Sequence, residues 1–182
     1  MAAFTKSIGP CRVVYKGTDL GSTLGEVTLA LNMETVDEKT NEDGDNPTGE
    51  FTTATMVSAS VPLTKASLMQ LAAVVPGSVL SSGEDRLGIK SQVGINLRDS
   101  AGELILKPVV NGTVSVDAGE WTYIPMAGAK PNWSVSHIYN GQKVYVTEFR
   151  GYPVEAADLV TGGALIGEDY NVGEICVMGS EA

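Results

Sequence analysis

The stretch LGEVTLALNMETVDEKTNEDGDNPTGEFTTATMVSASVPL, residues 24–63, decides the fold because it reads as two strands around a polar loop. In the first run, apolar residues alternate with polar or small ones, which is the period-two pattern of a half-buried strand. These apolar residues are Val27, Leu29, Leu31 and Met33. The second run, residues 51–63, has one apolar edge and one side of small and hydroxylated residues. We therefore expect two strands, of which the second has a smooth, uncharged side.

The segment between the two runs, residues 37–50, is rich in carboxylates and contains almost no apolar side chain. Its acidic residues are Asp37, Glu38, Glu42, Asp43, Asp45 and Glu50. Such a segment buries too little apolar surface to become ordered alone. Long loops in compact domains are usually functional or ordered by a partner. We expect this loop to be ordered by a neighbouring copy of the same protein.

Outside this hairpin, the pattern predicts short strands, tight turns and one helix. The helix is expected at residues 65–74, with Thr64 as its N-cap and Pro76-Gly77 after its end. Residues 17–21 are interpreted as a turn, and residues 93–98 and 103–107 as a hairpin around a four-residue connection. Asn140-Gly141, between alternating runs, predicts a type I′ hairpin.

About eight short strands with one helix indicate a mainly β protein, an antiparallel β-sandwich or barrel with one flanking α-helix and a long hairpin loop. The length of 182 residues suits a single domain over residues 1–182.

Composition limits the classes of partner. The formal net charge is −10, and the 12 basic residues are scattered, so tight binding of nucleic acid is not expected. We find no apolar run long enough to span a membrane and no secretory signal, so synthesis in a cytoplasm is expected. Cys11 and Cys176 lack metal-site spacing and are expected to be buried hydrophobes.

The sequence offers no convincing catalytic, cofactor or metal site. His137 is the single histidine, and we find no nucleophile motif to accompany it. The segment that begins at Asp43 fails the calcium-loop pattern, and the glycine-rich residues 162–167 have no Lys and no strand-to-helix frame. Three aromatic residues leave open a different class, a monomeric β-sandwich that binds carbohydrate. They are Trp121, Trp133 and Tyr139.

The segment GPCRVVYKGTDLGSTLGEVTL, residues 9–29, resembles the N-terminal signature of siphophage-type major tail tube proteins. The order of parts that follows is also similar: a long hairpin with a polar loop, a Val61-Pro62-Leu63 step, one helix and a late strand at residues 144–149. The resemblance is thin between residues 77 and 131, and the C-terminal end is longer than the family pattern leads us to expect.

The resemblance implies a structural, non-enzymatic virion protein without a cofactor, made in the cytoplasm of a bacterial host. Six subunits would form a ring, and rings would stack into a hollow tube through which DNA passes without specific binding. Other tail proteins (tape measure, tail terminator and tip) would be partners. Residues 37–50 would reach the next ring. The lumen-facing residues would be Glu26, Thr28, Asn32, Glu34, Thr52, Ala54, Ser58 and Ser60.

Overall fold

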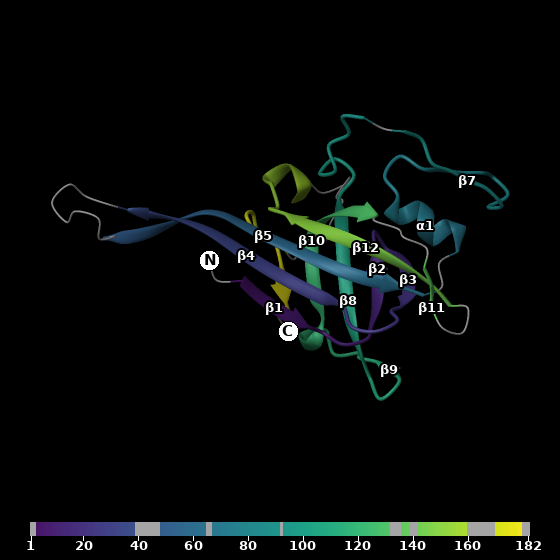
Figure 1. The fold of residues 1–182 in the computed structure, drawn as a ribbon, viewed down its shortest axis with the longest axis horizontal. Coiled ribbons are helices and arrows are strands. Elements are labelled where there is room, and N and C mark those ends of the chain that lie inside the picture. Colours follow the sequence, from purple (N-terminus) through teal and green to yellow (C-terminus); the bar gives the residue numbers. More distant parts are fainter. Residues whose placement is uncertain are drawn as a thin grey trace.

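The computed structural model describes residues 3–38, 48–64, 67–91, 93–131, 136–138, 142–159 and 170–179 (Figure 1). Its strands are β1 (Ala3–Ser7), β2 (Cys11–Tyr15), β3 (Thr18–Ser22), β4 (Thr28–Glu38), β5 (Gly49–Leu63), β6 (Val79–Leu80), β7 (Leu87–Gly88), β8 (Gly102–Val110), β9 (Thr113–Val114), β10 (Thr122–Pro131), β11 (Ser136–Ile138), β12 (Gln142–Tyr152) and β13 (Val177–Met178). In this part of the chain one α-helix, α1 (Leu68–Val74), and two short 3₁₀ turns, Ala118–Glu120 and Ala156–Leu159, complete the fold. The expectation of a mainly β protein with a single helix is confirmed.

One large antiparallel sheet makes up most of the molecule. Its main path is β1-β4-β5-β12-β10-β8-β2-β3, with β11, β13 and β9 paired at its sides, and β6-β7 form a separate small ribbon. The sheet curls back on itself: Thr23, directly after β3, forms a β-bridge with Leu63 at the end of β5. The N–H of Leu24 also donates to the carbonyl of Pro62 at 3.0 Å. Six strands therefore form a nearly closed ring around the core.

Buried Thr23 stabilises the contact between β3 and β5 through its hydrogen bonds. Its Oγ1 accepts from the N–H of Cys11 at 3.0 Å and donates to the carbonyl of Gly25 at 3.1 Å. Its own N–H donates to the carbonyl of Cys11 at 3.0 Å. A buried hydroxyl with these partners avoids the cost of an unsatisfied polar group.

The core fills the space inside the curled sheet. Tyr15 and Phe149 meet edge to face, with ring centroids 5.0 Å apart, and the Tyr15 hydroxyl donates to the carbonyl of Ala127 at 2.9 Å. Burial raises the pKa of Tyr15 to about 12 because the phenolate would lose its hydration. Leu104, Leu106 and Ile124 are fully buried beside this pair. The core therefore joins strands that are distant in the sequence.

The β4–β5 hairpin follows the predicted alternation near the body. Leu29 pairs with Ala59, and Leu31 pairs with Val57. Leu29, Val57 and Ala59 are buried, whereas Ser58, between two of them, is exposed. The period-two pattern thus sets which face of the hairpin packs on the core.

The helix is present, but its predicted N-cap is wrong. Ser67 caps α1: its hydroxyl accepts from the N–H of Gln70 at 3.3 Å, and its own N–H donates to the Gln70 side chain at 2.8 Å. Thr64 instead donates through Oγ1 to the carbonyl of Ser22 at 3.1 Å. The Ser-x-x-Gln spacing is a capping box, a reciprocal arrangement that Thr64 does not have.

The predicted strand at residues 93–98 is also wrong, although β8 includes the predicted partner. Asn96 Oδ1 accepts from the N–H of Arg98 at 3.1 Å, and Gly94 has φ +85°, so this segment forms turns. Val93 is 97% exposed and has no sheet neighbour to pack against. Local side-chain hydrogen bonds prevailed here over strand propensity.

Some of the predicted turns are present and others are not. Residues 17–21 were expected as one turn, but only Lys16 and Gly17 turn, with φ +50° and +72°, and β3 begins at Thr18. Residues 111–112 do form a turn, with positive φ at both positions. β11 and β12 pair as a hairpin, as predicted, but Ile138 lies opposite Gln142, whereas a two-residue type I′ turn at Asn140-Gly141 would place Tyr139 there. Residues 139–141 themselves lie outside the described residues.

The closed core makes a direct prediction about stability. Replacing Val13 (0% exposed) with alanine should lower the free energy of unfolding by about 2 kcal/mol, because two buried methyl groups are lost and a cavity remains. The matched change Val116→Ala, at a residue that is 92% exposed, should alter it by less than about 0.5 kcal/mol. Urea unfolding of both variants measures the difference, and equal effects would contradict this core assignment.

Candidate assembly surface

The outer half of the β4–β5 hairpin projects away from the body as a two-stranded ribbon (Figure 1). We call residues 33–38 and 49–56 the arm. Pairing of β1 with β4 stops at Asn32, and pairing of β12 with β5 stops at Val57. Among the described residues, both edges of the arm therefore have no strand partner. A two-stranded ribbon in water is marginally stable, and its unpaired N–H and C=O groups are a template for another strand.

A β-bulge lies near the base of the arm. The register shifts between Glu34 and Thr35, which leaves Thr53 as an extra residue on β5, and the Thr53 hydroxyl donates to the carbonyl of Glu34 at 3.1 Å. Bulges bend a strand and increase its twist. The bulge thus sets the direction in which the rest of the arm leaves the body.

The arm combines an apolar pair with carboxylates. Val36 and Phe51 lie directly opposite each other and are 56% and 60% exposed. Asp37 and Glu50 form the next cross-strand pair, and like charges in such a pair are destabilising. All four charged side chains of the described arm are acidic; they are Glu34, Asp37, Glu38 and Glu50. The isolated arm is therefore poorly supported by its own contacts.

The loop expected at residues 37–50 is shorter than predicted. Asp37 and Glu38 belong to β4, and Glu50 belongs to β5. The strands continue through these acidic residues because both faces of the arm are exposed. Each carboxylate can remain hydrated while the backbone of its residue pairs with the other strand. Glu42, Asp43 and Asp45 lie outside the described residues, and their inter-ring role stays a prediction.

Six of the eight residues predicted to face a lumen share one face of the β4–β5 ladder, opposite the core. Thr28 lies opposite Ser60, Ala30 opposite Ser58, and Glu34 opposite Ala54. Asn32 has the same parity. The other two are placed differently: Glu26 is exposed in the segment before β4, and Thr52 lies beyond the bulge.

The same face continues onto β12 and β10, which sequence reasoning missed. Ser60 lies opposite Glu148, which lies opposite Lys130, and Ser58 lies opposite Arg150. The alternation of buried Phe149 with exposed neighbours was visible in the sequence, but the strand order that places β12 beside β5 was not. The Arg150 guanidinium lies 5.9 Å from the centre of the Tyr152 ring. This face therefore carries both signs of charge.

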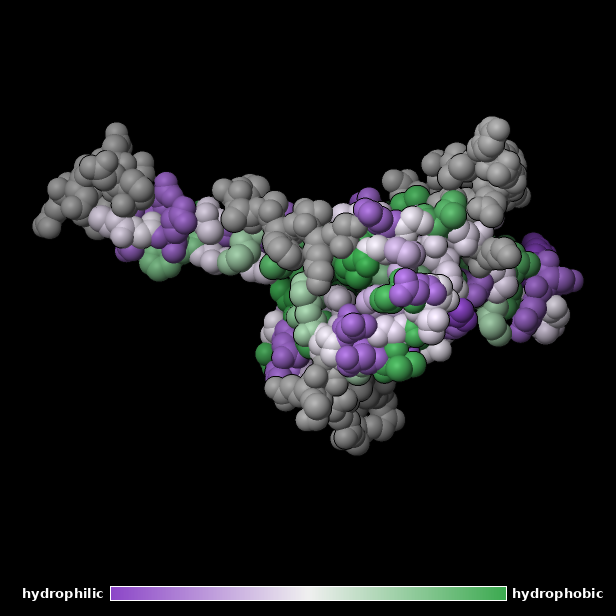
Figure 2. All heavy atoms as spheres, turned by 90° about the horizontal axis from the view of Figure 1, so that it is seen from below, coloured by the Kyte–Doolittle hydropathy of each residue, from purple (hydrophilic) through white to green (hydrophobic). Residues whose placement is uncertain are grey.

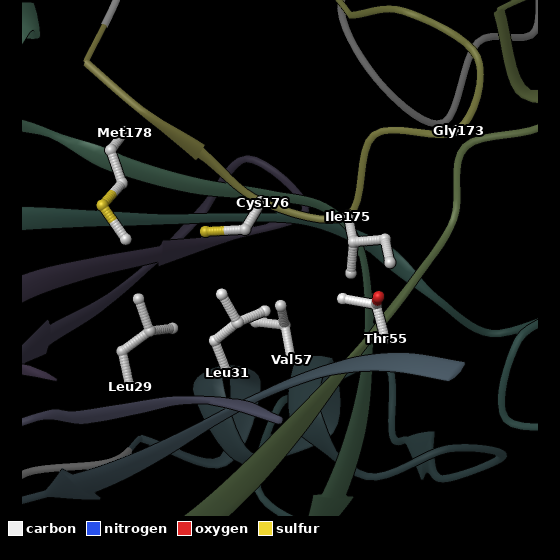
Figure 3. Close-up of a pocket in the computed structure, with 8 residues that line it drawn as sticks. All are labelled: Leu29, Leu31, Thr55, Val57, Gly173, Ile175, Cys176 and Met178. Carbon is white, nitrogen blue, oxygen red and sulfur yellow. The ribbon is translucent and has the colours of Figure 1, made fainter. Parts of the chain in front are cut away.

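An apolar groove lies between the base of the arm and the C-terminal segment (Figure 3). Its volume is about 480 Å³, and it is lined by Leu29, Leu31, Thr55, Val57, Gly173, Ile175, Cys176 and Met178. The segment is held by β13, which pairs with β10, and by the N–H of Gly173, which donates to the carbonyl of Val154 at 2.8 Å. Ile175 and Cys176 of this segment thus pack against one side of the core.

The structure gives little support to the other candidate sites from the sequence, which are the aromatic residues and the single histidine. Lys107 Nζ lies 3.8 Å from the centre of the Trp121 ring, so a cation occupies a face that a sugar would need. Trp133 and Tyr139 lie outside the described residues. His137 lies in β11, opposite Lys143. Across the described ranges we find no group of three or more His, Cys, Asp or Glu residues suited to a metal ion, and no helix long and apolar enough to cross a membrane.

Comparison with known proteins adds no family. The sequence matches no protein-family model and no curated protein. The function is therefore argued from the site and from the resemblance alone.

The groove makes a prediction about thiol reactivity. Burial raises the pKa of Cys176 to about 11, because the thiolate would be poorly hydrated there. Alkylation of this thiol by iodoacetamide should therefore keep rising with pH beyond 9, whereas an ordinary thiol levels off. Cys11, which is 0% exposed, should remain unlabelled in the folded protein. Cys176→Ala should abolish labelling, and a rate that levels off by pH 9 would contradict the assignment.

Proposed function

We propose that this chain is the structural subunit of a phage tail tube, which forms hexameric rings that stack into a hollow conduit for DNA. The observation that carries the proposal is the arm, a two-stranded ribbon whose described edges have no strand partner. A partner that supplies a strand to each edge satisfies the unpaired backbone N–H and C=O groups there.

Identical subunits are the simplest partner for such edges. The outer edge of β4 and the outer edge of β5 are different surfaces, so one copy can present its β4 edge to the β5 edge of the next. A head-to-tail contact of this kind closes into a ring when the rotation between neighbours divides a full turn. The number six comes from the resemblance to tail tube proteins. The arms of a ring would then line a continuous barrel.

The face of Thr28, Ser58 and Ser60 would line the bore. Hydroxyls and carboxylates carry no positive charge that would neutralise DNA phosphates, and the net charge of −10 opposes adsorption of DNA. Arg150 and Lys130 extend this face, but Lys130 lies opposite Glu148. The described part of such a bore would let DNA pass without holding it.

The proposal includes the partners and location that the resemblance implies. The subunit would contact tape measure, terminator and tip proteins within a virion tail, after synthesis in the host cytoplasm. It would need no catalysis and no cofactor.

Removal of the arm tests the proposal. Met33 lies opposite Thr55, so residues 34–54 can be replaced by an Asn-Gly turn that joins these two positions. We expect the shortened chain to unfold at a similar temperature, because the core lies below this point, but to remain a monomer, lighter than the 19.0 kDa of the full chain. The full chain should give particles of about 114 kDa, six times that mass, and tubes by negative-stain microscopy when concentrated.

Two results would count against the proposal. One is a full-length chain that stays monomeric at every concentration. The other is an armless chain that forms the same tubes as the full chain.

A further inference from the structure

The end of the molecule opposite the arm carries a second small ribbon. α1 and the β6–β7 hairpin lie at this far end of the long axis (Figure 1). Each strand of the ribbon has two residues, and neither has another strand partner among the described residues. Both ends of the molecule therefore present two-stranded ribbons with unpaired edges.

Both ends also expose large apolar side chains. At the far end, Met69 of α1, Val79 of β6 and Ile89 after β7 are each at least half exposed. On the arm, Val36 and Phe51 are exposed to a similar extent. Figure 2 shows apolar spheres on the arm and on the body among hydrophilic ones. Such residues at two distant ends suit a contact between different surfaces rather than a two-fold contact.

Charge favours a pairing of these two ends. The cross-strand carboxylates Asp37 and Glu50 repel each other on the arm. At the far end, Arg86 and Lys90 are exposed and form no salt bridge in the described part of the chain. Glu84 and Asp85 are also present there, and the Asp85 carboxylate accepts from the Ser81 hydroxyl. The ribbon thus has balanced formal charge, and Arg86 and Lys90 are the counter-charges that it offers to an acidic arm.

We propose that the arm of one copy docks on the far-end surface of a second copy, with Asp37 and Glu50 beside Arg86 and Lys90. We define the far-end surface as Met69, Val79, Arg86, Ile89 and Lys90. Val36 and Phe51 would cover the apolar residues of this surface. This inference rests on the proposed function and names the surface through which rings stack. The two surfaces lie at opposite ends of the long axis, so this contact repeats along that axis, whereas the contact between arm edges repeats around the ring.

A charge swap tests the docking. Glu50→Lys should raise the protein concentration needed for tube formation about tenfold, because a lysine then faces Arg86 and Lys90. It should not lower the unfolding temperature, because it turns the repulsive pair with Asp37 into an attractive one. Lys90→Glu should raise the required concentration to a similar extent, and the doubly changed chain, Glu50→Lys with Lys90→Glu, should recover most of the loss.

Glu84→Lys is the control of opposite sign, because it adds a base to the same ribbon. It should lower the concentration needed for tubes and let tubes persist at higher salt. Ile89→Ser supplies an uncharged probe of the same surface and should weaken stacking at all salt concentrations. Rings should remain at about 114 kDa in all these variants, as measured by sedimentation.

The outcomes separate this inference from the proposed function. If Lys90→Glu and Ile89→Ser both polymerise like the unchanged chain, the docking surface is wrong while the ring proposal stands. If the double change fails to recover what each single change loses, direct pairing of Glu50 with Lys90 is overturned. A full chain that forms no rings overturns the docking and the proposed function together.

Discussion

The pairing of β4 with β5 is the constraint on which the rest of the structure depends. Near the body, this ladder carries Leu29, Val57 and Ala59 into the core, where burial stabilises it. Farther out, the same ladder continues with water on both faces and without a third strand among the described residues. One continuous hairpin therefore has a base that is stabilised by core packing and an arm that is stabilised by neither core packing nor a third described strand.

The body of the subunit is more complete than the hairpin alone suggests. The Thr23–Leu63 bridge brings β3 back to β5, so the core is enclosed by strands of one chain. A single copy can thus fold with its core buried, and in the described part of the chain the arm is the long stretch of the main sheet whose two edges both lack a strand partner. This division is what a subunit needs if it folds first and assembles afterwards.

Local sequence patterns predicted much of the secondary structure. They could not predict which strands, distant in the sequence, lie side by side in the sheet. The alternation gave the correct buried face for Val27 and Leu29, because a strand has period two whatever its neighbours are, but Met33 is exposed because it lies beyond the body. Thr64 was mistaken for the cap because any hydroxyl before a helix fits the rule, whereas Ser67 has Gln70 at the reciprocal spacing. The charged residues that extend the polar face, Glu148 and Arg150, could not be found, because only the strand order places β12 beside β5.

Amide hydrogen exchange along β5 tests the central claim most directly, because it measures backbone protection at each position. The claim is that residues 49–56 are paired on only one side until a second copy adds a strand. In dilute monomer, residues 57–63 should be strongly protected and residues 49–56 weakly protected; on assembly, residues 49–56 should gain protection. Equal, strong protection of both segments in the monomer would contradict the account.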